Sequence, residues 1–175
     1  MKNIKIIVNK EAGTKEISNL RNIAYSCGLK NFSLENNGGS RALGADMPPE
    51  LFIAINFSIK ALAAGFFGAI GIDLWKKIKD FIIKSFKYYE NPSAPYLYNP
   101  DIYIEIKEEN KLKIQILFPT RKFREQELEK SLRTLDAPLK DDNLNESLFL
   151  YFSKGKWIIS KEEFKNHEES LKEIF

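Results

Sequence analysis

Side chains that could hold a metal or act as a nucleophile are few and scattered in this sequence. His167 is the only histidine and Cys27 the only cysteine, so His167 has neither a partner cysteine nor a second histidine with which to hold a metal. Cys27 precedes Gly28 at the end of a predicted helix, where a cysteine is most simply a core residue. We therefore predict no metal site and no bound cofactor.

Charged groups could bind an anion or perform hydrolysis at three places. The stretch NNGGSR (36–41) could bind an anion through its backbone amides and Arg41, but it has neither a Walker nor a dinucleotide pattern and is typical of a loop. A basic cluster at a predicted helix start could contact phosphate, although solvated charges explain it as well. That cluster consists of Arg121, Lys122 and Arg124. Five carboxylates lack a spacing that selects a catalytic pair, so we predict no catalytic residue and no enzyme. They are Glu125, Glu127, Glu129, Asp141 and Asp142.

The elements that would position these groups predict an α+β fold. The chain begins as a β-α-β unit, continues as one long central helix and ends as two units of β-hairpin plus helix, with antiparallel pairing. The long helix is expected from Pro49 to about Tyr88, and the second hairpin turns at Lys154 and Gly155. These elements divide the chain into segments 1–47, 48–90 and 91–175, the first and last of which are expected to share one domain.

The long predicted helix carries a stripe of small residues. At 100° per residue, spacings of four and three bring five of them onto one face. They are Ala54, Ser58, Ala61, Gly65 and Gly68. Such seams let helix backbones approach closely and are enriched where helices pack in lipid, so we expect this seam to pack helices of several copies together.

Polar and basic residues of the same helix suggest how it could sit in a membrane. Asn56 and Lys60, one turn apart, could line a shared aqueous interior, because a lysine in lipid would be costly. After Ile70 the apolar stripe becomes charged, as in a helix leaving a bilayer. Four residues are then expected at the membrane interface: Trp75, Lys76, Lys77 and Lys79. A helix leaving the cover of its own domain would show the same change, so a buried central helix is the alternative.

Bulk composition limits the classes of partner. The chain has 175 residues, of which 43% are hydrophobic and 13% aromatic, and this favours a folded protein over a disordered one. Its net charge of +3 permits an anionic surface as partner, but a dedicated nucleic-acid binder would be more basic. The N-terminal stretch lacks an apolar run of signal-peptide length. We expect a cytoplasmic protein associated with the inner membrane, with itself, lipid or another protein as partner and not nucleic acid.

The stretch GIDLWKKIK (71–79) carries a likeness of layout. Over residues 48–88 the chain resembles small bacterial proteins encoded beside antiviral and other conflict systems, including CRISPR accessory membrane-pore proteins. In these proteins a Gly-rich apolar helix runs into a GxDxW…K exit and is flanked by short α+β segments. The resemblance implies a defence role, and it carries over no functional residue.

Two functions of different classes follow from the sequence. The first is a membrane-associated, self-assembling protein, of pore-forming effector or accessory type, with residues 49–88 as its anchor. The second is a soluble interaction or immunity-type module whose central helix is buried in the core.

Overall fold

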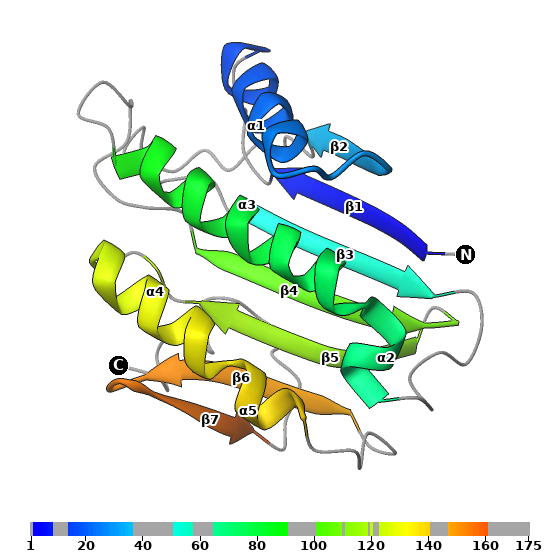
Figure 1. Cartoon of the computed structure of the whole chain (residues 1–175), viewed down its shortest axis with the longest axis vertical. Coiled ribbons are helices and arrows are strands. Elements are labelled where there is room, and N and C mark those ends of the chain that lie inside the picture. The colour runs from blue at the N-terminus through cyan, green and yellow to red at the C-terminus, as the bar shows by residue number, and fades with distance from the viewer. Residues whose placement is uncertain are drawn as a thin grey trace, which may run out of the picture.

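A computed structural model describes most of the chain (Figure 1). The described residues are 2–8, 14–36, 51–57, 65–90, 101–109, 111–118, 120, 123–140 and 147–160. They form one seven-stranded mixed sheet with helices lying over it, which confirms the predicted α+β class.

The sheet has the order β2-β1-β3-β4-β5-β6-β7. Its strands are β1 (Lys2–Val8), β2 (Phe32–Asn36), β3 (Leu51–Phe57), β4 (Ile102–Glu108), β5 (Lys111–Phe118), β6 (Leu148–Ser153) and β7 (Lys156–Ser160). The neighbours β1/β2, β3/β4 and β5/β6 are parallel, and the remaining neighbours are antiparallel. The sheet is therefore three parallel pairs placed in alternating directions, with β7 added at one edge.

Each parallel pair is joined by a crossover that contains helix. The helices are α1 (Thr14–Ser26), α2 (Gly65–Ile70), α3 (Ile72–Glu90), α4 (Glu125–Thr134) and α5 (Asp136–Leu139). Figure 1 shows all of them over the same face of the sheet. Helix α3 lies between α1 and α4, so it is the central element of the helical layer.

The three crossovers do not share one hand. The first two, through α1 and through α2 with α3, have the right-handed sense that is usual for parallel pairs (Figure 1). Strand β5 runs antiparallel to β4, while the step from β5 to β6 continues in the same direction across the sheet as the step from β3 to β4. Because α4 covers the same face as α3, the third crossover is left-handed.

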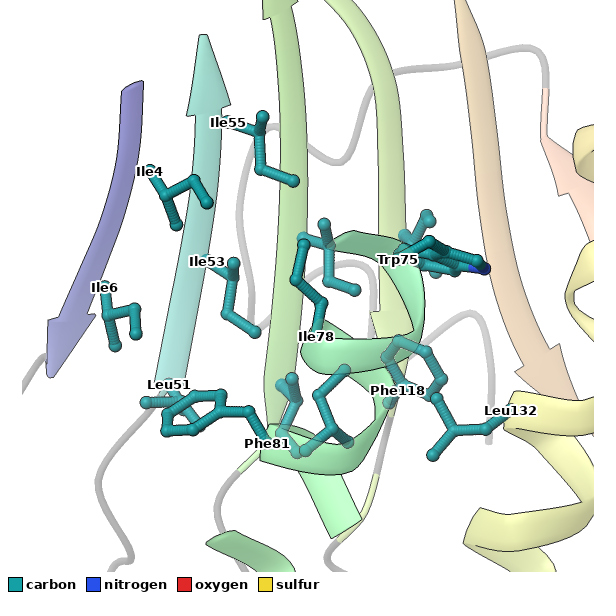
Figure 2. Close-up of a cluster of buried hydrophobic side chains, with 14 of the residues drawn as sticks. Ile4, Ile6, Leu51, Ile53, Ile55, Trp75, Ile78, Phe81, Phe118 and Leu132 are labelled. Atoms are coloured by element: carbon teal, nitrogen blue, oxygen red, sulfur yellow. The ribbon is translucent and has the colours of Figure 1, made fainter. Parts of the chain in front are cut away.

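The main core lies between the sheet and the helices. Alternate strand residues pair across the sheet in register, as Ile6 with Ile53 and Ile53 with Ile104, and these three are buried. Helix α3 covers them with Trp75, Ile78 and Phe81 (Figure 2). Every second residue of the strands therefore points into this core, while the helix contributes residues spaced by three or four from one of its faces.

The opposite face of the sheet also buries side chains around β4 and β5. Strand alternation places Tyr103 and Leu117 there, and they are paired with each other. Both are buried, as are Gln115 and Phe149 on the same face. Side chains at the centre of the sheet are therefore buried on both of its faces.

The predicted long helix from Pro49 to Tyr88 is wrong in its first half. Residues 51–57 form strand β3, and Gly71, with φ of +81°, separates α2 from α3. Leu51, Ile53 and Ile55 face the helices, so this apolar run alternates as a strand does, and a short run of this kind suits strand or helix equally. The second half of the prediction is confirmed as α3, which is long and central.

Two other predicted features are confirmed. Strands β4 and β5 form the first hairpin, and β6 and β7 form the second, which turns at Lys154 and Gly155, both with positive φ. The β-α-β start is present as β1, α1 and β2. The pairing is mixed, however, because β3 and β6 enter as parallel partners of β4 and β5. The predicted terminal helix at 161–175 lies outside the described residues.

Candidate functional site

Helix α3 turns two different faces to its surroundings. The inner face consists of buried residues spaced by three or four: Trp75, Ile78, Phe81, Ile82, Ser85, Phe86 and Tyr89. The outer face carries Lys76, Lys77 and Lys84, which are exposed. The helix is therefore amphipathic, and its lysines lie on the surface of the helical layer.

A polar cluster fixes the beginning of α3 to α5. The Trp75 Nε1–H donates a hydrogen bond to Asp136 Oδ1 at 2.8 Å. Lys79 Nζ binds both carboxylate oxygens of Asp136, at 3.0 and 2.9 Å, and lies 5.7 Å from the centroid of the Trp75 ring. One carboxylate thus satisfies the buried indole and pairs the lysine beside it.

A second set of contacts holds the other side of α3 against α1. The Tyr89 hydroxyl donates to Glu16 Oε1 at 2.6 Å, and both residues are buried. One residue earlier, the Asn19 amide donates to the Tyr88 hydroxyl at 3.3 Å. Helix α1 therefore contacts the end of α3 through side-chain hydrogen bonds within the packed layer.

Two lysines of α3 contact the C-terminal end of α1. Lys84 Nζ donates to Ser26 Oγ at 3.1 Å. The stem of Lys77 lies against Gly28, where a β-carbon would come within 3.3 Å of its Cε. Positive side chains at the C-terminal end of a helix complement the partial negative charge of that end.

Cys27 lies beneath these lysines and is buried. Burial raises the pKa of its thiol above the ordinary value, and the nearby Lys84 ammonium opposes that shift only in part. The thiol therefore stays protonated at neutral pH. This agrees with the predicted role of Cys27 as a core residue, since a reactive cysteine needs an exposed and stabilised thiolate.

The exposed lysines of α3 form the most distinctive charged surface among the described residues. We call Lys76, Lys77 and Lys84 the α3 cationic surface. None of the three forms an ion pair with a described residue, whereas Lys79 and Lys87 are paired with Asp136 and Glu125. Asp73 and Asp80 lie on the same outer face. Exposed cations nevertheless outnumber exposed carboxylates along α1 and α3. Lys15, Arg21 and Lys87 join the three lysines, and Glu90 joins the two aspartates.

The structure divides the four predicted membrane-interface residues into two pairs. Trp75 is only 1% exposed and Lys79 is held by Asp136, so both belong to the contact between α3 and α5. An interfacial tryptophan would need its ring at the surface, and Trp75 does not meet that requirement. Lys76 and Lys77 are exposed and remain available to a partner.

The predicted helical seam is not one stripe of one helix. Ala54 belongs to strand β3, while Gly65 and Gly68 belong to α2, and Gly68 is exposed. Ser58 and Ala61 lie outside the described residues. The prediction was wrong at Ala54, because it applied a helical period of 3.6 residues to the stretch 51–57, which pairs as a strand.

Only one residue of the predicted pore-lining pair lies among the described residues. Asn56 is a half-buried residue of β3, on the sheet face opposite the helices, and Lys60 lies outside the described residues. No helix among the described residues is both long enough and apolar enough to cross a membrane.

Other predicted groups do not gather into a site. Arg124 is the N-cap of α4, where its backbone N–H donates to Glu127 Oε2 at 2.9 Å. Five further groups lie outside the described residues: Arg41, Arg121, Lys122, the pair Asp141 and Asp142, and His167. Across the described ranges, no three residues of histidine, cysteine, aspartate or glutamate type come together as a metal site would require.

Sequence reasoning missed the two carboxylates that organise the helical layer. Glu16 and Asp136 stand 73 and 57 positions from Tyr89 and Lys79, and no local pattern links such distant partners. The sequence offered one signal, the tryptophan itself, because a buried tryptophan N–H requires an acceptor from some other part of the chain.

The comparisons with known proteins add no further assignment. No protein-family model, curated protein or solved structure matches this chain.

Proposed function

We propose that this protein is a non-catalytic interaction module that binds an acidic surface of a partner protein through the α3 cationic surface. The observation that supports it is the division of α3. Its apolar and aromatic residues fill the core, while Lys76, Lys77 and Lys84 stand outside without an ion pair in the described chain. This corresponds to the second function expected from the sequence.

Placement of the central segment favours this function over a membrane anchor. Residues 51–57 form a central strand between β1 and β4, and its Ile53 and Ile55 are buried against the helical layer. Exposing them to lipid would require the helical layer to open away from the sheet. Burial of apolar side chains is the main term that stabilises a fold, so such an opening would be costly.

The side-chain hydrogen bonds near both ends of α3 support a role in recognition. The hydrogen bond from Trp75 to Asp136 fixes its beginning, and that from Tyr89 to Glu16 fixes its end. The lysine stems between these points project from a helix that need not be ordered on binding. Preorganised charges steer an oppositely charged partner and speed its association.

Binding of a polyglutamate peptide tests this proposal. Fluorescence anisotropy of the labelled peptide is expected to rise with protein concentration at low salt, and this binding should weaken steeply as salt is added. The triple substitution Lys76→Glu, Lys77→Glu and Lys84→Glu should reduce the affinity at least tenfold. A matched control changes Lys111, Lys130 and Lys140, which are also exposed, to Glu.

The control separates a local surface from a net-charge effect. Equal losses in the two triple variants would show that charge alone governs the binding and would overturn the proposal. Anionic phosphatidylserine vesicles provide a second probe. If they bind in a manner that depends on α3 while the peptide does not, the partner is a lipid surface rather than a protein. A role in antiviral defence remains a prediction of the sequence.

A further inference from the structure

Strand β7 forms one edge of the sheet and carries the most exposed large hydrophobic residue of the described chain. Ile159 is 62% exposed, compared with 59% for Ile72 and 56% for Tyr25. Strand β7 pairs with β6 on its inner side, and no strand of the described chain lies on its outer side (Figure 1). An apolar edge of this kind is a template for another strand.

The hairpin turn fixes which backbone groups of β7 point outward. The two-residue turn at Lys154 and Gly155 makes Ser153 and Lys156 the closing pair, whose backbones bond each other. Hydrogen-bonded and non-hydrogen-bonded pairs then alternate along the ladder. Ile158 therefore bonds inward to β6, while the N–H and C=O groups of Trp157 and Ile159 point to the open edge.

The geometry points to a homodimer in which β7 pairs with β7 of a second copy, antiparallel and centred on Ile158. In this register Trp157 of each copy faces Ile159 of the other, and both are the residues whose backbone groups point outward. All four outward groups of each strand are then bonded. Moving the register by one residue would place backbone groups that point outward opposite groups that point inward to β6. The alternation of these backbone groups therefore excludes the adjacent registers.

The side chains fit the same register. Strand alternation places Trp157 and Ile159 on the face covered by α4, where the Trp157 indole N–H donates to the Ser131 carbonyl at 2.9 Å. The exposed Ile159 would thus lie beside an aromatic residue that is already held in place. Lys156 falls opposite Ser160 of the other copy, so no like charges face each other across the new pair.

The opposite edge of the sheet is less suited to such pairing. Strand β2 exposes Ser33 and Glu35, and Glu35 forms an ion pair with Lys5 at 2.6 Å. Charged residues on an edge strand discourage pairing with another chain. Strand β7 also carries one charge, Lys156, but at its first residue, while its most exposed residue is the apolar Ile159, so β7 is the edge better suited to pairing. This dimer uses a surface separate from the lysines of α3, so either proposal can fail without the other.

Sedimentation velocity of the full chain tests the dimer. At tens of micromolar the protein should sediment with twice the mass of one chain. Ile159→Lys should convert it to a monomer, while Ile72→Lys, which alters an equally exposed isoleucine away from the edge, should leave the dimer unchanged. Thermal melting monitored by circular dichroism checks that both variants fold. A wild-type monomer at 100 µM, or a dimer that survives Ile159→Lys, would overturn the proposal.

Disulfide cross-linking tests the register. Ile158 of one copy faces Ile158 of the other in a non-hydrogen-bonded pair, where the short distance between opposed residues suits a disulfide. Ile158→Cys should therefore give a cross-linked dimer on mild oxidation. Ser160→Cys lies on the same face of β7 but opposite Lys156, and it should remain monomeric on a non-reducing gel. Equal cross-linking of the two variants, or none in Ile158→Cys, would contradict this register.

Discussion

Helix α3 is held by different kinds of contact on its two sides. Toward α1, the Tyr89 hydroxyl meets the buried carboxylate of Glu16. Toward α4 and α5, charged pairs dominate: Lys79 with Asp136, and Lys87 with Glu125. Ion pairs are thus more numerous on the second side, but they lie nearer to water. We therefore expect the buried contact with α1 to contribute more to the free energy of unfolding than the more exposed ion pairs do.

The strongest test removes the aromatic anchor on the α4 and α5 side. Trp75→Ala should lower the free energy of unfolding by about 3–5 kcal/mol, because it leaves a cavity against Phe66 and deprives Asp136 of a donor. Urea denaturation followed by circular dichroism measures the change. The neighbouring exposed Lys76→Ala should leave the denaturation midpoint where it is. A small effect of Trp75→Ala would mean that this part of the core is loosely packed.

The next test concerns the α1 side. Tyr89→Phe keeps the ring but removes the hydroxyl that donates to Glu16, and it should cost about 1–3 kcal/mol because both groups are buried. Tyr88→Phe is its control, since the Tyr88 hydroxyl accepts a longer bond in a half-buried position. The comparison between the two sides would break down if Tyr88→Phe were the more damaging change in the same denaturation experiment.

A smaller effect is expected from neutralising the carboxylate that joins α3 to α5. Asp136→Asn can still accept the Trp75 N–H but loses the ion pair with Lys79, and a loss of about 1 kcal/mol is expected. Thermal melting at low and high salt measures it. Because a partly exposed ion pair is screened by salt, the gap between wild type and variant should narrow as salt rises. A gap that does not change with salt would point to lost hydrogen bonding instead.

The least effect is expected at the exposed pair of Lys87 and Glu125. The hydrogen bond and charge of Glu125 raise the pKa of Lys87 above its ordinary value of 10.5. A raised lysine pKa gives a contribution that is complete below the ordinary pKa and is lost as the pH rises through the folded-state value. Lys87→Met should therefore show no pH-dependent difference from wild type between pH 6 and 9, and no measurable change in midpoint. A clear loss at pH 7 would show that this pair is less screened than its exposure implies.

Local patterns predicted much of the fold, and they failed where the partner was distant. The hairpin of β6 and β7 was predictable because its turn and both strands lie within 147–160. The face pattern of α3 was predictable from spacing, with Ile78 and Ile82 inward and Lys77 and Lys84 outward. Strand β3 was not, because its apolar residues suit a helix or a strand until β1 and β4 are known to flank it.

The candidate site shows the same limit. The exposure of Lys76 and Lys77 follows from helix periodicity, so these two residues were predictable as surface groups. The sequence could not tell that Trp75 points into the protein, since a tryptophan beside lysines is equally typical of a membrane interface. Its acceptor, Asp136, is 61 positions away and belongs to a different crossover.

The position of β3 sets an order of events during synthesis. Leu51 pairs with Ile102, so the strand that completes the middle of the sheet is made about 50 residues after β3 itself. At roughly 5–20 residues per second, the apolar stretch 51–57 leaves the ribosome several seconds before its second partner does. During that interval β3 can pair with β1 on one edge, while its other edge has no strand to pair with. The middle of the finished sheet is thus an open strand edge while the chain is being made, and such an edge is what a nascent-chain chaperone would bind.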